Sequence, residues 1–279
     1  MNEEDRIVAT EEGDLRLKGR AKSKGKVEGA VLKSRKALSL VRDVNPETSE
    51  ILSRESGIMG ESVSQRVLIF PHAKKAKDYT QPLMKLKKKK LAPVAIVSEA
   101  LNITVTQDAA SAGIPAVDRL DISLLETGDD VVVSGTNGFV VLKNVVLKNV
   151  TTSVITSKGK VLILKRSDDV GTYKGRWACV SGYMEKGETA DKTALREISE
   201  ELGLNRDEFA FVRKGKVLYA RDKGIIWTVH PFLFEAKTPD IQLDWEHIEF
   251  KWIYPEDIES YSTVPKLKET MESVFVLNE

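Results

Sequence analysis

Residues 182–204 read GYMEKGETADKTALREISEELGL, and this stretch decides how the second half of the chain is built. Residues 189–202 are good helix formers, and Gly203 stands where a left-handed residue commonly ends a helix. An apolar stripe at helical spacing is formed by Ala194, Leu195, Ile198 and Leu202. The stretch therefore predicts an amphipathic helix that follows a glycine-containing turn.

Three glutamates of this helix, Glu197, Glu200 and Glu201, stand at i, i+3 and i+4, so their carboxylates share a neighbouring face. Clustered anions repel one another unless a cation binds them, and Mg²⁺ prefers carboxylate, water and phosphate oxygens. The alternative is a solvated acidic face on which Arg196 is a surface ion-pair donor. We favour a metal site because many spaced positions match one pattern together.

That pattern is a glycine, five residues, a glutamate, seven residues, and then R-E-apolar-x-E-E-x-G-apolar. Its fixed positions are filled by Gly182, Glu188, Arg196, Glu197, Ile198, Glu200, Glu201, Gly203 and Leu204. This is the Nudix box, so residues 148–279 resemble the Nudix hydrolase superfamily. The resemblance implies an α/β/α sandwich that hydrolyses a diphosphate with Mg²⁺ or Mn²⁺.

The same resemblance implies roles for residues of the box. The expected metal ligands are the Gly182 carbonyl, Glu197, Glu200 and Glu201. Glu197 could instead orient the attacking water as a base. Arg196 completes the catalytic set, and we expect it to pair with Glu188 and hold the preceding loop against the helix.

A strand hairpin is predicted over residues 150–167, ending in Lys165 and Arg166. A basic residue at this place commonly reaches substrate phosphates in Nudix enzymes, and we assign that role to Arg166. The alternative interpretation is a surface charge at the end of a strand.

A late acidic residue near the metal or the water is common in Nudix enzymes, and Glu246, His247 and Glu249 stand in that region. We assign Glu249 to the substrate. Trp177 and Cys179 are instead predicted to be core residues, the second as an inert buried thiol.

Two strands are predicted after the box, over residues 209–219 and 224–235, around a turn at 222–224. His230 on the second strand stands among aromatic residues, so we interpret it as a core histidine and not as a catalyst. A final helix is predicted from Pro265.

The first half of the chain has a different pattern. Apolar runs at 66–70 (RVLIF) and 93–97 (PVAIV) indicate buried strands. Residues 129–142 indicate a hairpin with a turn at Asn137-Gly138. Short helices are predicted over residues 82–91 and 107–112.

The segments LKGRAKSKGKVEGAVL, DVNPETSEI, GESVSQRVLIFP, LAPVAIV and GIPAVD lie in order within residues 15–142. They resemble the swivel domain of aconitase X, the small subunit of archaeal phosphomevalonate dehydratase, which implies a swivelling β/β/α fold. We therefore expect a mixed α/β (α+β) chain, with a swivel domain at residues 1–147 and a Nudix domain at residues 148–279.

The swivel-like half departs from that family where catalysis would occur. In the family, a Gly/Ser-rich loop after the VLIFP strand supplies a catalytic serine, but Ala76 and Lys77 stand there. Related swivel domains of phosphoenolpyruvate-using enzymes carry a phosphorylated histidine, and no histidine lies between His72 and His230. We expect a non-catalytic domain that presents substrate, regulates or dimerises.

Charge and cysteine content exclude several classes of protein. The 43 basic and 42 acidic residues nearly cancel, which disfavours nucleic acid as a partner. Residues 74–90 hold eight lysines, which could form a patch for phosphate or nucleic acid but which we interpret as a solvated helix face. The single cysteine and the absence of a signal peptide or a membrane span indicate a cytoplasmic protein that does not contact membranes.

The box predicts the reaction but leaves the substrate open. We expect a small-molecule diphosphate, by default a nucleoside diphosphate derivative, with an isoprenoid diphosphate as second choice. Isopentenyl diphosphate isomerase is a Nudix relative in which a cysteine directly precedes the box glycine. That activity is disfavoured here because Ser181 stands at this position and Cys179 lies two residues earlier. A non-catalytic sensor of a phosphorylated ligand and a homodimer are further alternatives.

Overall fold

The computed structural model describes residues 7–10, 13–75 and 81–275. The chain divides into two compact units, Met1–Val146 and Leu147–Glu279. Among the described residues, no helix is both long enough and apolar enough to cross a membrane. Each unit has its own sheet and its own buried core, so each is described separately.

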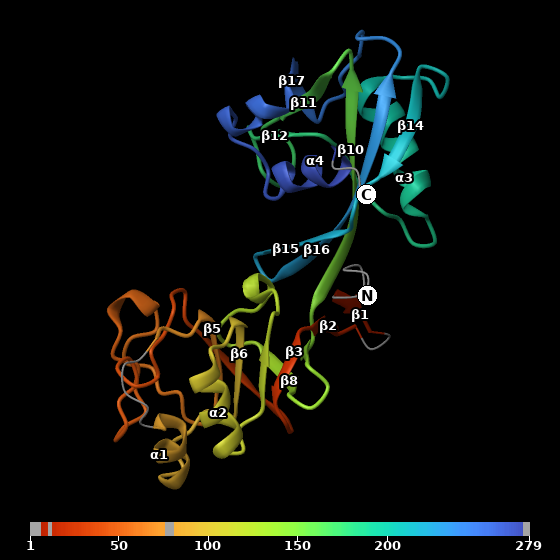
Figure 1. Ribbon diagram of the computed structural model, residues 1–279. Coiled ribbons are helices and arrows are strands. Elements are labelled where there is room, and N and C mark those ends of the chain that lie inside the picture. The colour runs from red at the N-terminus through yellow and green to blue at the C-terminus, as the bar shows by residue number, and fades with distance from the viewer. Residues whose placement is uncertain (1–6, 11–12, 76–80, 276–279) are drawn as a thin grey trace. The chain divides into compact units, whose positions relative to one another are not determined.

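The described part of the first unit is built on one nine-stranded sheet (Figure 1). Its strands are β1 (Ile7–Ala9), β2 (Leu15–Lys18), β3 (Arg20–Ser23), β4 (Lys26–Lys33), β5 (Val67–His72), β6 (Ala95–Ala100), β7 (Ala116–Asp118), β8 (Asp130–Ser134) and β9 (Phe139–Leu142). Their spatial order is β1-β2-β9-β8-β4-β5-β6-β7-β3. The neighbouring pairs β4–β5, β5–β6 and β6–β7 are parallel, and the other neighbouring pairs are antiparallel.

This sheet curls strongly. Only Gly19 separates β2 from β3 in the sequence, yet the two strands stand second and last in the spatial order, so the ends of the sheet must approach each other. A Cβ at Gly19 would lie 2.5 Å from the carbonyl oxygen of Asp118, which explains why the crossing needs glycine.

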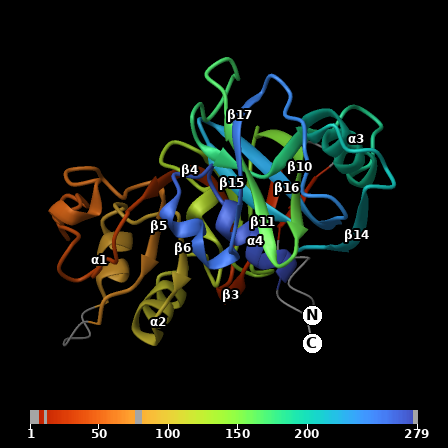
Figure 2. The same cartoon turned by 90° about the horizontal axis from the view of Figure 1, so that it is seen from above.

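Two helices, α1 (Pro82–Lys88) and α2 (Ile103–Ser111), lie beside β5 and β6 (Figure 2). The buried strand predicted at RVLIF is confirmed, because the side chains from Val67 to Phe70 are fully buried. Helix α2 begins earlier than predicted because Asn102 caps it, accepting a hydrogen bond from the Val105 amide at 3.0 Å. Short 3₁₀ turns complete the unit at Arg54–Ser56 and Ile122–Leu124.

The second unit carries an eight-stranded sheet in its described part. Its strands are β10 (Val146–Ser157), β11 (Lys160–Arg166), β12 (Trp177–Ala178), β13 (Val180–Tyr183), β14 (Phe209–Lys214), β15 (Leu218–Asp222), β16 (Ile225–Ala236) and β17 (His247–Ile253). The main order is β12-β11-β10-β16-β14, with β13 on β10, β15 on β16 and β17 on β11. The predicted hairpin of β10 and β11 is confirmed by its antiparallel pairing.

Helices α3 (Ala190–Leu202) and α4 (Leu267–Phe275) cover opposite faces of this sheet, and a 3₁₀ turn spans Pro255–Ser260 (Figures 1 and 2). Successive strand residues alternate between two cores, as the pleat requires. Leu162 and Leu164 pack with the α3 residues, whereas Val161 and Ile163 pack with the α4 residues. The predicted mixed α/β class and the α/β/α layering of this unit are confirmed.

One strand prediction is wrong. Residues 209–219 form two strands, β14 and β15, which pair in succession with the long β16. The strand is interrupted at Gly215, whose amide donates a hydrogen bond to the Pro231 carbonyl at 2.9 Å. A Cβ at Gly215 would lie 2.9 Å from Cβ of Pro231. Proline has no amide proton to continue the ladder, so the pairing is interrupted there.

Candidate active site

Helix α3 has the ends that the sequence predicts. Thr189 is the N-cap residue, and Gly203 ends the helix in the left-handed conformation with a φ of 65°. Strand β13 precedes the helix and packs against it, so the two elements meet at Gly182. A Cβ on Gly182 would overlap the Glu197 carboxylate, and therefore only glycine allows this approach.

Arg196 joins the turn before α3 to the carboxylates on the helix. As expected, it pairs with Glu188, with its Nε 3.4 Å from Oε1. Its Nη1 also lies 2.8 Å from Oε1 of Glu197 and 2.8 Å from Oε2 of Glu200, and its Nη2 donates to the Tyr183 carbonyl. The hydrogen bonds from Arg196 lower the pKa of Glu188, so this network keeps its ion pairs near neutral pH.

The three glutamates lie in different environments. The Glu200 side chain is 58% exposed, that of Glu197 is 12% exposed, and Glu201 is buried. Burial raises the pKa of Glu201 well above its usual value, and nearby acids add to this effect. Oε1 of Glu201 accepts the Ser181 amide at 3.2 Å, but Oε2 has no hydrogen-bond partner among the described residues.

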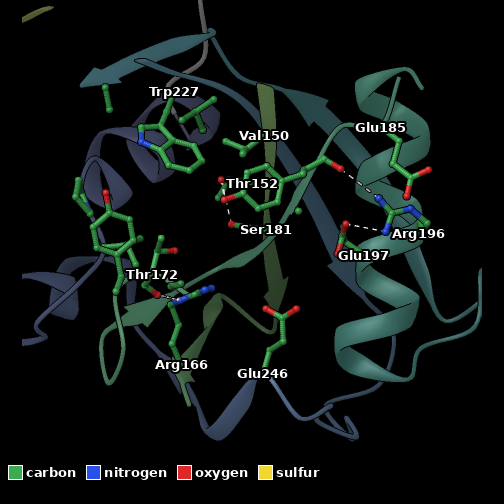
Figure 3. Close-up of a pocket in the computed structure, with 18 residues that line it drawn as sticks. Val150, Thr152, Arg166, Thr172, Ser181, Glu185, Arg196, Glu197, Trp227 and Glu246 are labelled. Atoms are coloured by element: carbon green, nitrogen blue, oxygen red, sulfur yellow. Dashed lines mark hydrogen bonds and ion pairs between the residues drawn. The ribbon is translucent and has the colours of Figure 1, made fainter. Parts of the chain in front are cut away.

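A pocket of about 340 Å³ opens beside these residues (Figure 3). Glu185, Arg196 and Glu197 line its α3 side, and Arg166 and Glu246 lie together at one end. At the other end lie Trp227 and Val150, with Tyr183 packed against Trp227, and Tyr173 also lines the pocket. The pocket therefore combines a charged part with an aromatic part, as small-molecule sites commonly do.

The aromatic part comes from residues that the sequence analysis did not assign to the site. The Tyr183 and Trp227 rings lie 5.7 Å apart at a tilt of 43°. Lys148 lies over both, with its Nζ 5.3 Å from the Tyr183 centroid and 5.7 Å from that of Trp227. Tyr173 donates from its hydroxyl to Asp222 at 2.8 Å, and burial raises the pKa of Tyr173 to about 12. No sequence pattern marked these residues, because they come from four separate stretches.

Of the two residues assigned to the substrate, Arg166 lines the pocket, where its Nε donates to the Thr172 carbonyl at 3.0 Å. Glu249 is not among the lining residues. Its carboxylate lies 3.7 Å from Lys165 Nζ and 3.3 Å from Lys251 Nζ. Glu246, which directly precedes β17, faces the pocket in its place.

Three predictions for core residues can be compared with the structure. Trp177 and Cys179 are buried in the core beneath α4, as predicted, and burial raises the pKa of the Cys179 thiol to about 12. His230 is only half-buried, and its Nε2 lies 3.3 Å from the Asn149 side chain. It does not line the pocket, which agrees with a structural histidine.

The residues also bear on whether a divalent metal fits. Among the described residues, no group of three or more His, Cys, Asp and Glu side chains is arranged to hold a metal ion by itself. The unpartnered, buried Oε2 of Glu201 and the close approach of Gly182 to Glu197 are nevertheless features that a cation with oxygen ligands would use. The donor set therefore fits a hard cation whose remaining ligands are water or phosphate.

Comparison with known proteins accounts for both units. Residues 16–142 match the aconitase X swivel domain, and residues 147–274 match the NUDIX domain. The chain belongs to the aconitase X swivel family over its first half, and its second half carries a segment that matches the NUDIX domain. Both predicted resemblances are confirmed, and the Nudix domain supports a hydrolase that acts on pyrophosphate bonds. Nudix hydrolases generally use divalent metals, most often Mg²⁺.

Curated relatives cover the swivel domain. The phosphomevalonate dehydratase small subunit of Thermococcus sibiricus is 40% identical over 124 residues, which are 44% of this chain and 95% of the relative. The small subunit of Methanosarcina acetivorans is 36% identical over 131 residues, 46% of this chain and 91% of the relative. By this similarity the chain belongs to the family of these small subunits over its first half.

Solved structures resemble each domain separately. Aconitase X of Thermococcus kodakaraensis in its holo form is 38% identical and covers 46% of this chain and 98% of its own, with a TM-score of 0.45. The MutT protein of Methanosarcina mazei is 22% identical and covers 46% of this chain and 93% of its own, with a TM-score of 0.41. The swivel-domain positions Ala76 and Lys77, where relatives would carry serines, lie outside the described residues.

Proposed function

We propose that the Nudix domain hydrolyses a diphosphate linkage in a nucleoside diphosphate derivative, with Mg²⁺ or Mn²⁺. The observation that carries this proposal is the pocket, in which Glu197 and Glu185 line one side and an aromatic pair lies at the far end. The charged part suits a diphosphate with its cation, and the aromatic part suits the group attached to it.

The proposed metal ligands are Glu197, Glu200, Glu201 and the carbonyl oxygen of Gly182. When bound, a divalent metal would polarise the phosphate and offset the charge that develops on it. Glu197 lines the pocket, where its carboxylate can orient a water molecule toward the phosphorus. Arg196 holds Glu197 and Glu200 with its Nη1, so it positions the carboxylates from outside the reacting atoms.

Charges at the Arg166 end support phosphate binding. Arg166 is fixed by its hydrogen bond to the Thr172 carbonyl, and its guanidinium keeps further donors that suit phosphate oxygens. Glu246 lies beside Arg166 in the pocket, and we propose that it takes the role of the late acidic residue first assigned to Glu249.

The aromatic part favours a planar group attached to the diphosphate. A nucleobase could stack on Trp227 or Tyr183, and such stacking is worth about 1–3 kcal/mol. An isoprenoid diphosphate is the second candidate, because the first domain is similar to small subunits of phosphomevalonate dehydratase. We propose that the swivel domain itself is non-catalytic and presents substrate, regulates or dimerises.

Hydrolysis of a panel of substrates, with the phosphorylated products that cleavage releases separated by ion-exchange chromatography, tests the proposal. The panel holds nucleotide sugars, dinucleoside polyphosphates, nucleoside triphosphates and isoprenyl diphosphates, each with and without Mg²⁺ or Mn²⁺. Glu200→Gln and Glu201→Gln should each lower turnover by about a hundredfold or more, because an amide cannot replace an anionic ligand. The matched control is Glu235→Gln, an exposed position on β16 that should keep wild-type rates. No release from any compound with metal present would favour the sensor alternative.

A further inference from the structure

His247 and Glu201 meet inside the Nudix domain, although they come from different elements. Glu201 stands in the last turn of α3, and His247 is the first residue of β17. Their side chains are 4% and 1% exposed, and Nδ1 of His247 lies 3.7 Å from Oε2 of Glu201. The pair is therefore enclosed by protein, and its geometry is fixed by the packing of the helix against the sheet.

Asp244 anchors the same nitrogen of the histidine ring. Its Oδ1 lies 3.2 Å from Nδ1 of His247, which is shorter than the distance to Glu201. A neutral imidazole carries one N–H, and with its proton on Nδ1 the ring donates to Asp244 while the same edge faces Glu201. Both carboxylates therefore approach Nδ1, on one edge of the ring.

This arrangement bears on the free oxygen of Glu201. A buried carboxylate is costly unless its oxygens find hydrogen bonds or a cation. The Ser181 amide satisfies Oε1, whereas Oε2 has no hydrogen-bond partner among the described residues. Without a fixed neighbour at Oε2, the carboxylate could turn toward Asp244 or away from the site.

We infer that His247, anchored by Asp244, is a positioning residue that holds the buried Glu201 carboxylate in the orientation needed to bind a divalent cation. The inference rests on the proposed function, because it takes Glu201 as a metal ligand. Residues that orient metal ligands through hydrogen bonds commonly change metal affinity by about 10- to 100-fold when they are replaced. His247 belongs to neither the Nudix box nor the pocket lining, so its role comes from the packing alone.

Mn²⁺ binding to the full chain, measured without substrate by electron paramagnetic resonance of the free ion, tests this role. His247→Phe keeps a ring but removes both nitrogens, and we expect its Mn²⁺ affinity to fall by about tenfold or more. His247→Asn places an amide N–H near the position of Nδ1 and should stay within about threefold of wild type. His230→Phe is the matched control and should bind Mn²⁺ as wild type does.

A second variant keeps the test decisive if His247→Phe does not fold. Asp244→Ala removes the anchor from a loop residue whose side chain is 19% exposed, and it should also weaken Mn²⁺ binding. Wild-type affinity in a folded His247→Phe protein or in Asp244→Ala would overturn the inference. Equal losses in the Phe and Asn variants would also overturn it, since the donor would then not matter.

The two proposals can fail separately. If the wild-type protein binds Mn²⁺ but hydrolyses no substrate, the proposed function is wrong. The positioning role is then still decided by the Mn²⁺ affinities of the His247 and Asp244 variants. Active enzyme with unchanged Mn²⁺ affinity in the His247 variants would remove the positioning role alone. A wild-type protein without any Mn²⁺ binding would overturn the inference.

Discussion

Gly182 and Glu197 share one small space, because a Cβ on Gly182 would overlap the Glu197 carboxylate. The glycine is held by strand pairing with Thr151 on β10, and the glutamate is held on α3 by Arg196. Neither backbone can retreat without breaking these interactions. The absence of a side chain at residue 182 therefore determines where the Glu197 carboxylate lies.

Gly182→Ala should displace the Glu197 carboxylate and lower turnover by about a hundredfold, because a shift of the order of 1 Å is enough for such a loss. The fold should survive, since a flexible side chain gives way more easily than the strand. Turnover and thermal unfolding should be measured together. Gly171→Ala, where the backbone is not left-handed and the space for a Cβ is open, separates a general effect of replacing a glycine from this one. A Gly182→Ala enzyme with normal turnover would contradict the assignment.

Trp227→Leu should raise KM for a nucleotide substrate by roughly tenfold, because the base would lose an aromatic surface worth about 1–3 kcal/mol. Trp227→Phe keeps a ring and should recover most of the affinity. Steady-state kinetics on the preferred substrate measures both. If the substrate is an isoprenoid diphosphate, the leucine variant should change KM little, and the nucleobase interpretation would be withdrawn.

The Cys179 thiol should resist alkylation in the native protein. Its pKa is raised to about 12 by burial, so at pH 8 almost all of it is the unreactive thiol, and the thiolate fraction rises only as the pH approaches that value. Iodoacetamide labelling followed by mass spectrometry should be slow in buffer and fast in concentrated urea. Rapid native labelling at pH 8 would show that the site opens.

A fragment of residues 147–279 should fold and hydrolyse the substrate by itself. This unit has a complete sheet between two helical layers, and its pocket is lined by its own residues. Circular dichroism and the same hydrolysis assay check the two claims. A folded but inactive fragment, beside an active full chain, would make the swivel domain part of the active site.

The full chain should show no phosphomevalonate dehydratase activity, even when mixed with a large subunit from a related organism. The family resemblance places Ala76 and Lys77 where a catalytic serine would stand, and neither side chain can replace its hydroxyl. A dehydration assay tests this, and calorimetry with 5-phosphomevalonate tests separately whether binding persists. Measurable dehydration would show that the alignment of this loop is wrong.

The amino-acid sequence by itself determined the local elements of the site. Helix α3, its end at Gly203 and the ion pair of Arg196 with Glu200 follow from residues close together in the chain. Helical spacing brings residues three and four positions apart into contact whatever the rest of the fold does. The buried strand at residues 67–70 also follows from a local feature, because a short apolar run is enough to predict it.

Only the tertiary structure decided which late acidic residue faces the pocket. Strand β17 pairs with β11, and the register shifts between Lys165 and Arg166, so that Arg166 lies opposite His247. Glu249 pairs with Lys165 on one side of this shift and lies between lysines, whereas Glu246, on the other side, lines the pocket. A shift of one residue in a strand exchanges its two faces, and the partner strand sets that register from about eighty positions away in the sequence. The contact of Tyr183 on β13 with Trp227 on β16, and the contact of His247 with Glu201, also join residues far apart in the sequence and could not be derived from local spacing.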